Sequence, residues 1–183
     1  MTLVLRNRLI GIVLALAIFA IDQWFKGFVT HDLGIDRLGE FREVLPFFDL
    51  RFTQNFGVSL GMFEADSVEM RWALVGFTAL IALVVTVWML REKLLGEILG
   101  LAMILGGALG NIKDRYEYGY VIDYADLHFG TFRPFLIFNI ADAAITIGVV
   151  IILARAFFLR DKPDNEASEP ADPAVENSPV ETM

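Results

Sequence analysis

The chain has 183 residues, of which 56% are hydrophobic, and it contains no cysteine. The apolar residues gather in runs of about 15–20, which is typical of a membrane protein with several spans. Without cysteine there is no disulfide framework, thiol nucleophile or cysteine-bound metal cluster. Of the net charge of −8, most comes from residues 161–183, so the rest of the chain has no basic face for nucleic acid.

Four apolar segments are expected to cross the membrane as helices. The second carries no charge and is about 28 Å long as a helix, close to the hydrocarbon thickness of a bilayer. The third is shorter, so its charged flanks are expected at the membrane boundaries. The fourth follows Pro134, a residue type that is favoured at helix starts. The predicted spans are residues 9–29, 72–90, 98–112 and 135–154, within a single membrane domain over residues 1–160.

The first span has an alternative interpretation as a cleavable signal peptide. Arg6 and Arg8 precede the apolar run, and Ala15-Leu16-Ala17 resembles a cleavage site. Apolar sequence continues beyond that site, and the polar residues behind it are regularly spaced. These two features favour a retained span, which puts both termini on one side of the membrane.

The distribution of basic residues predicts the orientation. Lysine and arginine near the span ends are equally numerous on both sides, but those on the side of the termini lie in short, dense segments. This density favours cytoplasmic termini. The two longer loops then face outward, and residues 49–53 of the first alternate polar and apolar, which predicts a strand. Residues 161–183, rich in proline and acids, are predicted to be a disordered cytoplasmic tail.

Polar side chains in or beside the spans are candidates for function, because a charge in hydrocarbon costs about 2.5–3.5 kcal/mol. Asp22 and Lys26 are four residues apart on one helix face, so they can form a neutralising ion pair. Asn111, Asp114 and Arg115 share a face at the end of the third span, after three glycines that allow close helix packing. Both groups also have a purely structural interpretation, as a salt bridge and as a charged helix end.

Two aspartates are the strongest catalytic candidates. Asp142 lies inside the fourth span, about 10 Å below the outer end of the predicted helix. Asn139 lies on the same helix face. Asp123 lies in the second outer loop, where an aspartate is usually a turn or cap residue. Asn55 and Gly57 follow the predicted strand in a stretch that is also compatible with an ordinary glycine-containing loop.

If Asp123 folds back towards Asp142, the two carboxyl groups can hold a water molecule between a base and an acid. Adjacent carboxyls cannot both ionise cheaply, so one keeps a proton. The base then activates water for attack on a carbonyl carbon, and the acid protonates the oxygen or the departing nitrogen. Asn111 and Asn139 can orient the substrate. Such hydrolysis needs neither metal nor cofactor, and it predicts a substrate at the outer leaflet.

These residues resemble one family, the bacterial lipoprotein signal peptidases (signal peptidase II). The resemblance extends over about residues 21–150 in the same order, and its third and fourth motifs are the most specific. Val58, Leu60 and Tyr124 depart from the residues that are more usual in the family. The motifs are Asp22-x-x-x-Lys26, Asn55-x-Gly57-x-x-x-Gly61, Gly106-Gly107-Ala108-x-Gly110-Asn111-x-x-Asp114-Arg115-x-x-x-Gly119-x-Val121-x-Asp123-Tyr124 and Phe138-Asn139-x-Ala141-Asp142-x-x-Ile145-x-x-Gly148.

The resemblance implies an all-α membrane protein with four transmembrane helices, a small extracytoplasmic β element and an arm lying on the membrane. It implies an aspartic endopeptidase of the bacterial cytoplasmic membrane, with Asp123 and Asp142 as catalytic dyad near the outer leaflet. The implied substrate is a diacylglyceryl prolipoprotein, cut just before its lipidated cysteine, and the implied inhibitor is a globomycin-type cyclic peptide. The residues implied to bind substrate or support the dyad are Asn55, Gly57, Asn111, Asp114, Arg115, Asn139, Asp22 and Lys26.

Two alternatives belong to other classes of protein. An intramembrane aspartyl protease of the presenilin type usually needs a Gly-x-Gly-Asp motif and more spans, and the sequence has neither. A small ion-coupled carrier would use Asp142 to bind a proton or cation, with the glycine-rich third span as a packing face. The carrier does not account for the polar residues that cluster towards the outer side.

Overall fold

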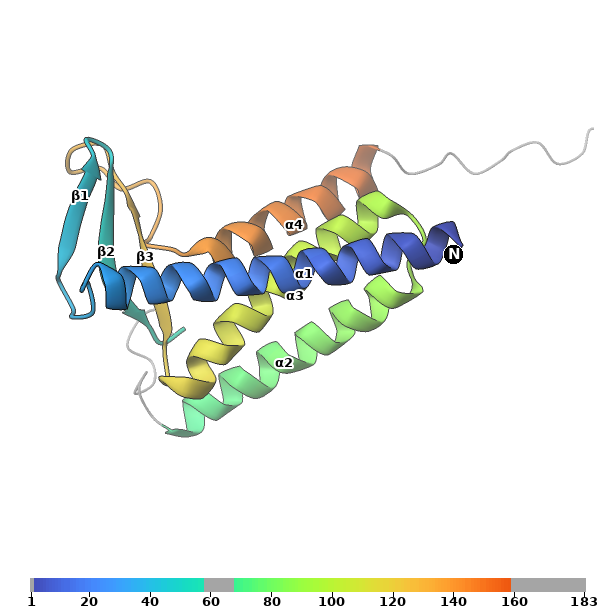
Figure 1. Ribbon diagram of the computed structural model, residues 1–183, viewed down its shortest axis with the longest axis horizontal. Helices are drawn as coiled ribbons and strands as arrows, with labels where there is room; N and C mark the ends of the chain where they lie inside the picture. Colours follow the sequence, from blue (N-terminus) through green and yellow to red (C-terminus); the bar gives the residue numbers. More distant parts are fainter. Residues whose placement is uncertain (1, 58–67, 159–183) are drawn as a thin grey trace, which may run out of the picture.

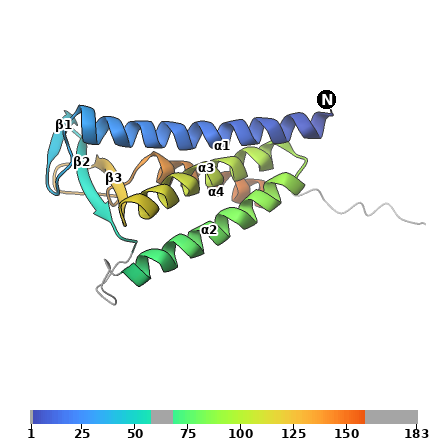
Figure 2. The ribbon, with the colours of Figure 1, turned by 60° about the horizontal axis from the view of Figure 1, so that its bottom comes forward.

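The computed structural model describes residues 2–57 and 68–158. Four helices lie side by side in a bundle, and a three-stranded sheet lies across one end of it (Figures 1 and 2). The predicted acidic tail and Gly61 of the loop motif fall outside the described residues. The helices are α1 (Leu3–Gly27), which continues as the π-helical turn η1 (Phe28–Asp32), α2 (Val68–Arg91), α3 (Leu95–Glu117) and α4 (Ile140–Phe158).

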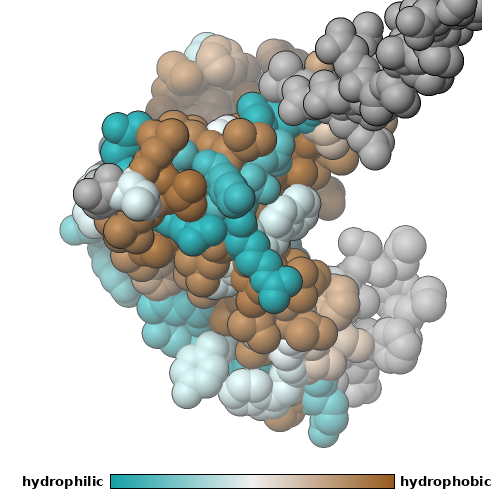
Figure 3. Space-filling model, turned by 90° about the vertical axis from the view of Figure 1, so that its right-hand side faces the viewer, coloured by the Kyte–Doolittle hydropathy of each residue, from teal (hydrophilic) through white to brown (hydrophobic). Residues whose placement is uncertain are grey.

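In the described part of the chain, four helices are long and apolar enough to cross a membrane, as predicted. Large apolar side chains such as Leu83, Val84 and Phe157 are exposed on the sides of the bundle, where lipid would surround them. The start of α1, the α2–α3 connection and the end of α4 lie at the end of the bundle opposite the sheet (Figure 1). Figure 3 looks onto that end and shows hydrophilic side chains gathered between hydrophobic surfaces.

Helix α3 is the centre of the bundle and packs against α1, α2 and α4. Glycines allow the close approach. A Cβ atom on Gly106 would lie 2.6 Å from the carbonyl oxygen of Ala15 in α1, and one on Gly110 would lie 2.5 Å from Oδ2 of Asp22. Helix α1 runs without a break through residues 15–17, the candidate cleavage site.

The sheet is antiparallel, in the order β1-β2-β3. Residues 49–53, predicted to be a strand, lie within β2. Apart from Leu127 at its end, β3 is buried, and its apolar side chains share a core with Val29 of η1 and Phe52 of β2. The strands are β1 (Phe41–Leu45), β2 (Phe48–Asn55) and β3 (Val121–Leu127).

Two expectations about secondary structure were wrong. Asp123 does not lie in a loop; it lies in β3. Helix α4 does not begin directly after Pro134, because the backbone of Phe138 is hydrogen-bonded to β3. Asn139 then caps the helix, since its Oδ1 accepts the backbone N–H of Asp142 at 2.9 Å. Asp142 is therefore in the first turn of α4, at the end of the helix nearest the sheet.

We predict that Gly106→Ala lowers the melting temperature of the protein in detergent, because the added methyl group collides with the α1 backbone. Overpacking of this kind costs about 1–3 kcal/mol. The matched control is Gly76→Ala in α2, where a Cβ atom would meet nothing within 4 Å. There the substitution is expected to leave stability unchanged or to raise it by about 0.5–1 kcal/mol. Equal melting temperatures for the two variants would contradict close α1–α3 packing at Gly106.

Candidate active site

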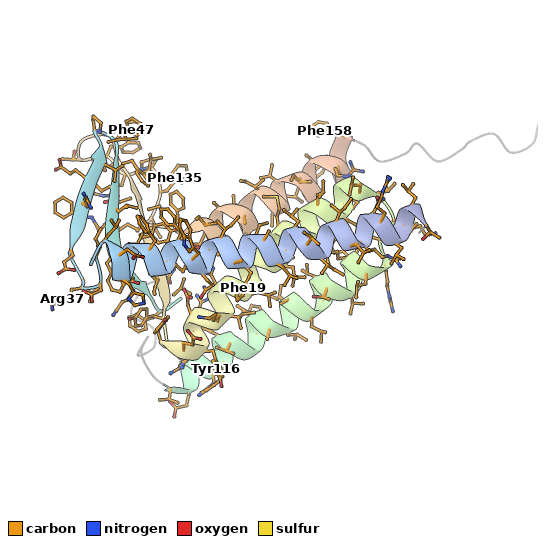
Figure 4. The ribbon with its side chains drawn as sticks, viewed as in Figure 1. Phe19, Arg37, Phe47, Tyr116, Phe135 and Phe158 are labelled. Carbon is orange, nitrogen blue, oxygen red and sulfur yellow. The ribbon has the colours of Figure 1, made fainter. Side chains whose placement is uncertain are left out.

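Polar side chains from several elements meet where the sheet crosses the bundle. They come from α1, α3, β2, β3 and the start of α4. Figure 4 shows Phe135 close to this junction, in the segment between β3 and α4. Asp123 and Asn139 are only 2% and 1% exposed. Buried polar groups need hydrogen-bond partners, and the partners are found within this cluster.

Asn139 connects the two candidate aspartates. Its side-chain Nδ2 donates a hydrogen bond to Oδ1 of Asp123 at 2.6 Å. Its backbone N–H donates to Oδ2 of Asp142 at 3.2 Å. Asp123 in β3 and Asp142 in α4 are 19 residues apart in the sequence. Their carboxyl groups are nevertheless both hydrogen-bonded to Asn139.

Two further asparagines hold the remaining carboxyl oxygens. Asn111 Nδ2 donates to Oδ1 of Asp142 at 2.8 Å, and Asn55 Nδ2 donates to Oδ2 of Asp123 at 3.0 Å. The orientation of the Asn55 amide is set by the backbone N–H of Gly57, which donates to its Oδ1 at 2.8 Å. Gly57 has a φ of 79°, a conformation that favours glycine. Each oxygen of the two aspartates thus accepts a hydrogen bond.

Behind the aspartates lies a buried cluster of charges centred on Lys26. Its ammonium group contacts Oδ2 of Asp22 and Oδ2 of Asp114, both at 2.8 Å, and donates to Oδ1 of Asn111 at 3.3 Å. An ammonium group has three N–H donors, and all three are used here. The contact turns the amide oxygen of Asn111 towards Lys26 and its NH2 group towards Asp142. The predicted ion pair of Asp22 and Lys26 is confirmed, and Asp114 is added to it.

The two carboxylates of this cluster also hold the backbone beside the candidate aspartates. Asp22 Oδ1 accepts the N–H of Ala141 at 3.0 Å, and Asp114 Oδ2 accepts the N–H of Ile122 at 3.1 Å. Each N–H group belongs to the residue directly before one of the two candidates. Gln23 Nε2 donates to both carboxylates, at 3.1 and 2.9 Å. The cluster therefore sets the positions of β3 and α4 relative to each other.

The environment of Asp123 favours its protonated form. Burial raises its pKa from 3.8 to about 7, and the nearby charge of Asp142 adds to the increase. Hydrogen bonds from Asn55 and Asn139, and the positive charge of Lys26, act in the opposite direction. Asp123 thus retains a proton well above the pH at which an exposed aspartate loses it.

Two grooves reach the aspartates. The larger, of about 800 Å³, is lined by Asp123 and Arg115, and the smaller, of about 330 Å³, is mostly apolar and reaches Asp142 along α4. Phe135 and Leu136 line both grooves, so the grooves adjoin. The Nε atom of Arg115 has no hydrogen-bond partner among the described residues. Over the same residues, no cluster of three histidine, aspartate or glutamate side chains is suited to a metal ion.

Comparisons with known proteins agree on one family. The family model described as signal peptidase (SPase) II matches residues 14–158. The lipoprotein signal peptidase of Sphingopyxis alaskensis is 47% identical over 161 residues, which cover 88% of this chain and 92% of the relative. That of Rhizorhabdus wittichii is 44% identical over 155 residues, covering 85% and 90%. The chain belongs to the signal peptidase II family.

A solved structure has a similar fold. A bacterial membrane enzyme solved by the in meso method superimposes with a TM-score of 0.70 and 26% identity, covering 86% of this chain and 94% of that chain. The fold is mostly helical with four membrane helices and a small sheet, as expected for signal peptidase II. Membership of the family makes the chain a protease, and its helices and bacterial relatives indicate a multi-pass protein of the inner membrane.

Most of the predicted site residues gather in one hydrogen-bonded network. Gly57 and Arg115 border the larger groove beside it. Sequence reasoning missed the role of Gln23, although its place between two polar residues of one helix was a signal. It also missed Arg133, which lines the larger groove and is held by Asp126. The network comprises Asp22, Lys26, Asn55, Asn111, Asp114, Asp123, Asn139 and Asp142.

We predict that Lys26→Met severely destabilises the protein, because it leaves the Asp22 and Asp114 carboxylates buried without a cation. Breaking a buried ion pair in this way costs about 3–5 kcal/mol. The measurement is thermal unfolding in detergent. Lys113→Met is the control, since Lys113 is partly exposed and forms an ion pair with Glu117 in its own helix. An unchanged melting temperature in Lys26→Met would show that the buried cation does not support the fold.

The raised pKa of Asp123 predicts a pH-dependent stability. The folded protein binds this proton more tightly than the unfolded chain, so the contribution of Asp123 is fully favourable below about pH 4 and is lost as pH rises through about 7. The melting temperature of Asp123→Asn, minus that of the parent protein, should therefore increase between pH 5 and pH 8. Asp36→Asn, a change at an exposed aspartate, should follow the parent. Parallel curves for parent and Asp123→Asn would contradict the prediction.

Proposed function

We propose that the chain is an aspartic endopeptidase that removes the signal peptide from diacylglyceryl prolipoproteins, cutting N-terminal to the lipidated cysteine. The names of its relatives, lipoprotein signal peptidases, support the class of substrate. The observation that carries the mechanism is the contact of Asn139 with both aspartates, at 2.6 Å to Asp123 and 3.2 Å to Asp142. Two carboxyl groups held on one residue suit a pair that shares a water molecule and a proton.

In the proposed reaction the two aspartates have complementary roles at the start of the cycle. Asp142 accepts a proton from the water molecule, whose oxygen attacks the carbonyl carbon of the scissile bond. Asp123, which keeps its proton because burial raises its pKa to about 7, donates it to the carbonyl oxygen. The tetrahedral intermediate then collapses as the C–N bond breaks. The departing nitrogen takes the proton from Asp142, and the product hydroxyl returns one to Asp123.

Residues around the dyad have supporting roles in this proposal. Asn111 and Asn139 keep the carboxyl groups in place before the substrate binds, which lowers the cost of reaching the transition state. Arg115, whose Nε lacks a partner among the described residues, donates to a backbone carbonyl group of the substrate. Asn55 and Gly57 border the same groove and contact the peptide there.

The two adjoining grooves fit a substrate that is part peptide and part lipid. We assign the larger groove, with its polar lining around Asp123, to the segment that follows the cleavage site. The apolar groove along α4 next to Asp142 is assigned to the apolar part of the substrate within the membrane. In this arrangement both termini are cytoplasmic and the site faces the outer leaflet. A globomycin-type cyclic peptide would compete for the same grooves.

The ion-coupled carrier is the weaker alternative. A carrier needs one accessible acid, and Asp142 alone would serve. A carrier does not require a second buried carboxyl such as that of Asp123, which is bonded to Asn139. Nor does it require Arg115 in the lining of the larger groove. The paired carboxyls therefore favour hydrolysis.

The test is cleavage of a diacylglyceryl prolipoprotein by purified protein in detergent or lipid. Asp123→Asn and Asp142→Asn should each reduce turnover by at least about a thousandfold, because either change removes the base or the acid. Both variants should still unfold cooperatively. Asp36→Asn is the control, because Asp36 is an exposed aspartate that is not among the residues lining either groove.

The control should keep turnover within a few-fold of the parent protein. Near-normal turnover in either dyad variant would rule out the aspartic mechanism. Cleavage by the parent at a bond other than the one preceding the lipidated cysteine would leave the mechanism intact and correct the proposed specificity.

A further inference from the structure

One side chain joins the outer end of α2 to the end of α3. Arg71 Nε donates to the carbonyl oxygen of Arg115 at 2.7 Å, and its Nη2 donates to the carbonyl oxygen of Tyr116. The last carbonyl groups of a helix lack donors within the helix and carry the negative end of its dipole. A guanidinium group that bonds two of them holds the final turn of α3 in place.

Other contacts make this junction well defined. The ring of Trp72 packs edge-on against that of Tyr116, with centroids 5.8 Å apart. The Arg71 guanidinium lies 5.5 Å from the Trp72 ring. Figure 4 shows Tyr116 at the end of α3, next to the start of α2. Helix α2 packs mainly against α3, so this end of the helix is fixed through α3 rather than through the rest of the bundle.

The residue that Arg71 holds by its backbone is the one that enters the larger groove with its side chain. A Cβ atom on Gly57 would lie 3.2 Å from Nη2 of Arg115 and 3.0 Å from Leu74 Cδ1, so the Arg115 guanidinium and Leu74 of α2 both lie close to Gly57, just after β2. Its Nε has no hydrogen-bond partner among the described residues. The place of this guanidinium is therefore set by its backbone and by packing.

We infer that Arg71 is a positioning residue, which fixes the guanidinium of Arg115 in the substrate groove by bonding the last carbonyl groups of α3. This inference rests on the proposed function, in which Arg115 binds the substrate. Arginine is required because its planar fork donates to two carbonyl oxygens at once, whereas the lysine ammonium is a single point on a flexible stem. Arg71 is not among the described residues that line the two grooves, and its contact with a groove residue is the bond to the carbonyl oxygen of Arg115.

The position of Arg115 matters electrostatically as well as sterically. The charged groups that face its guanidinium are Asp123 from β3, Asp142 from α4 and Asp114 from its own helix. If the guanidinium moves away, the carboxyl of Asp123 loses a nearby positive charge and holds its proton to a higher pH. Displacement of the Arg115 guanidinium therefore shifts the pH at which Asp123 loses its proton, whereas a general loss of protein stability does not.

The experiment measures kcat, KM and the pH profile of kcat/KM for Arg71→Lys and Arg71→Ala in the full chain, with a diacylglyceryl prolipoprotein. Each variant is assayed well below its own melting temperature. We expect kcat/KM to fall roughly 10-fold in Arg71→Lys and more in Arg71→Ala, since small misplacements of a binding group have effects of this size. The alkaline limb of the profile should move to higher pH in both. Lys113→Ala, at a partly exposed basic residue of the same helix end, should match the parent.

Unchanged kcat/KM and pH profile in both Arg71 variants would overturn the inference. So would a fall in kcat/KM with an unmoved alkaline limb, or a failure of both variants to fold, because Arg71 would then be a general support of the bundle. These outcomes are separate from a failure of the proposed function. If the parent protein does not cleave the prolipoprotein, the proposed substrate is wrong whatever the variants do.

Discussion

The ammonium group of Lys26 is the interaction on which the rest of the site depends. A buried cation is tolerated only when acceptors surround it, and here Asp22, Asp114 and Asn111 supply them. The two carboxylates in turn accept N–H groups from Ala141 and Ile122. One charge thus ties together α1, α3, the start of α4 and β3, and it does so without touching the two candidate aspartates directly.

The Lys26 cluster and the two candidate aspartates have different hydrogen-bond partners. Lys26 offsets one of the two carboxylate charges, and N–H donors from Gln23 and from the backbone also bind the carboxylates, so the cluster can be buried deeply. Among the described residues, the carboxyl groups of Asp123 and Asp142 accept hydrogen bonds from neutral donors, which belong to Asn55, Asn111 and Asn139. Neutral donors compensate a buried charge less than a cation would, and burial accordingly raises the pKa of Asp123 to about 7. The raised pKa of Asp123 thus reflects burial that its amide donors offset only in part.

Sequence reasoning succeeded where the relevant contact is local or the constraint is the bilayer. The four spans follow from apolar length, and the pairing of Asp22 with Lys26 follows from helical spacing. It failed where a segment is shaped by distant partners. Asp123 was expected in a loop, but it lies in a strand. That strand forms by pairing with β2, which is distant in the chain and could not be identified from the local sequence. The start of α4 was misplaced because Phe138 is held by the sheet, which outweighs the preference of Pro134 for a helix start.

By itself, the sequence determined that the chain crosses the membrane, that polar residues sit at defined places in or beside the spans, and that these match the motifs of one family. The spacing of polar residues along a helix is a local property, and so is the free-energy cost of placing them in hydrocarbon. Both can therefore be inferred from the order of residues. Only the tertiary structure decided that Asn139 contacts both aspartates and that Asp114 joins the Lys26 pair. Those contacts connect segments brought together by packing, and direction and distance in space are not encoded in any single stretch of residues.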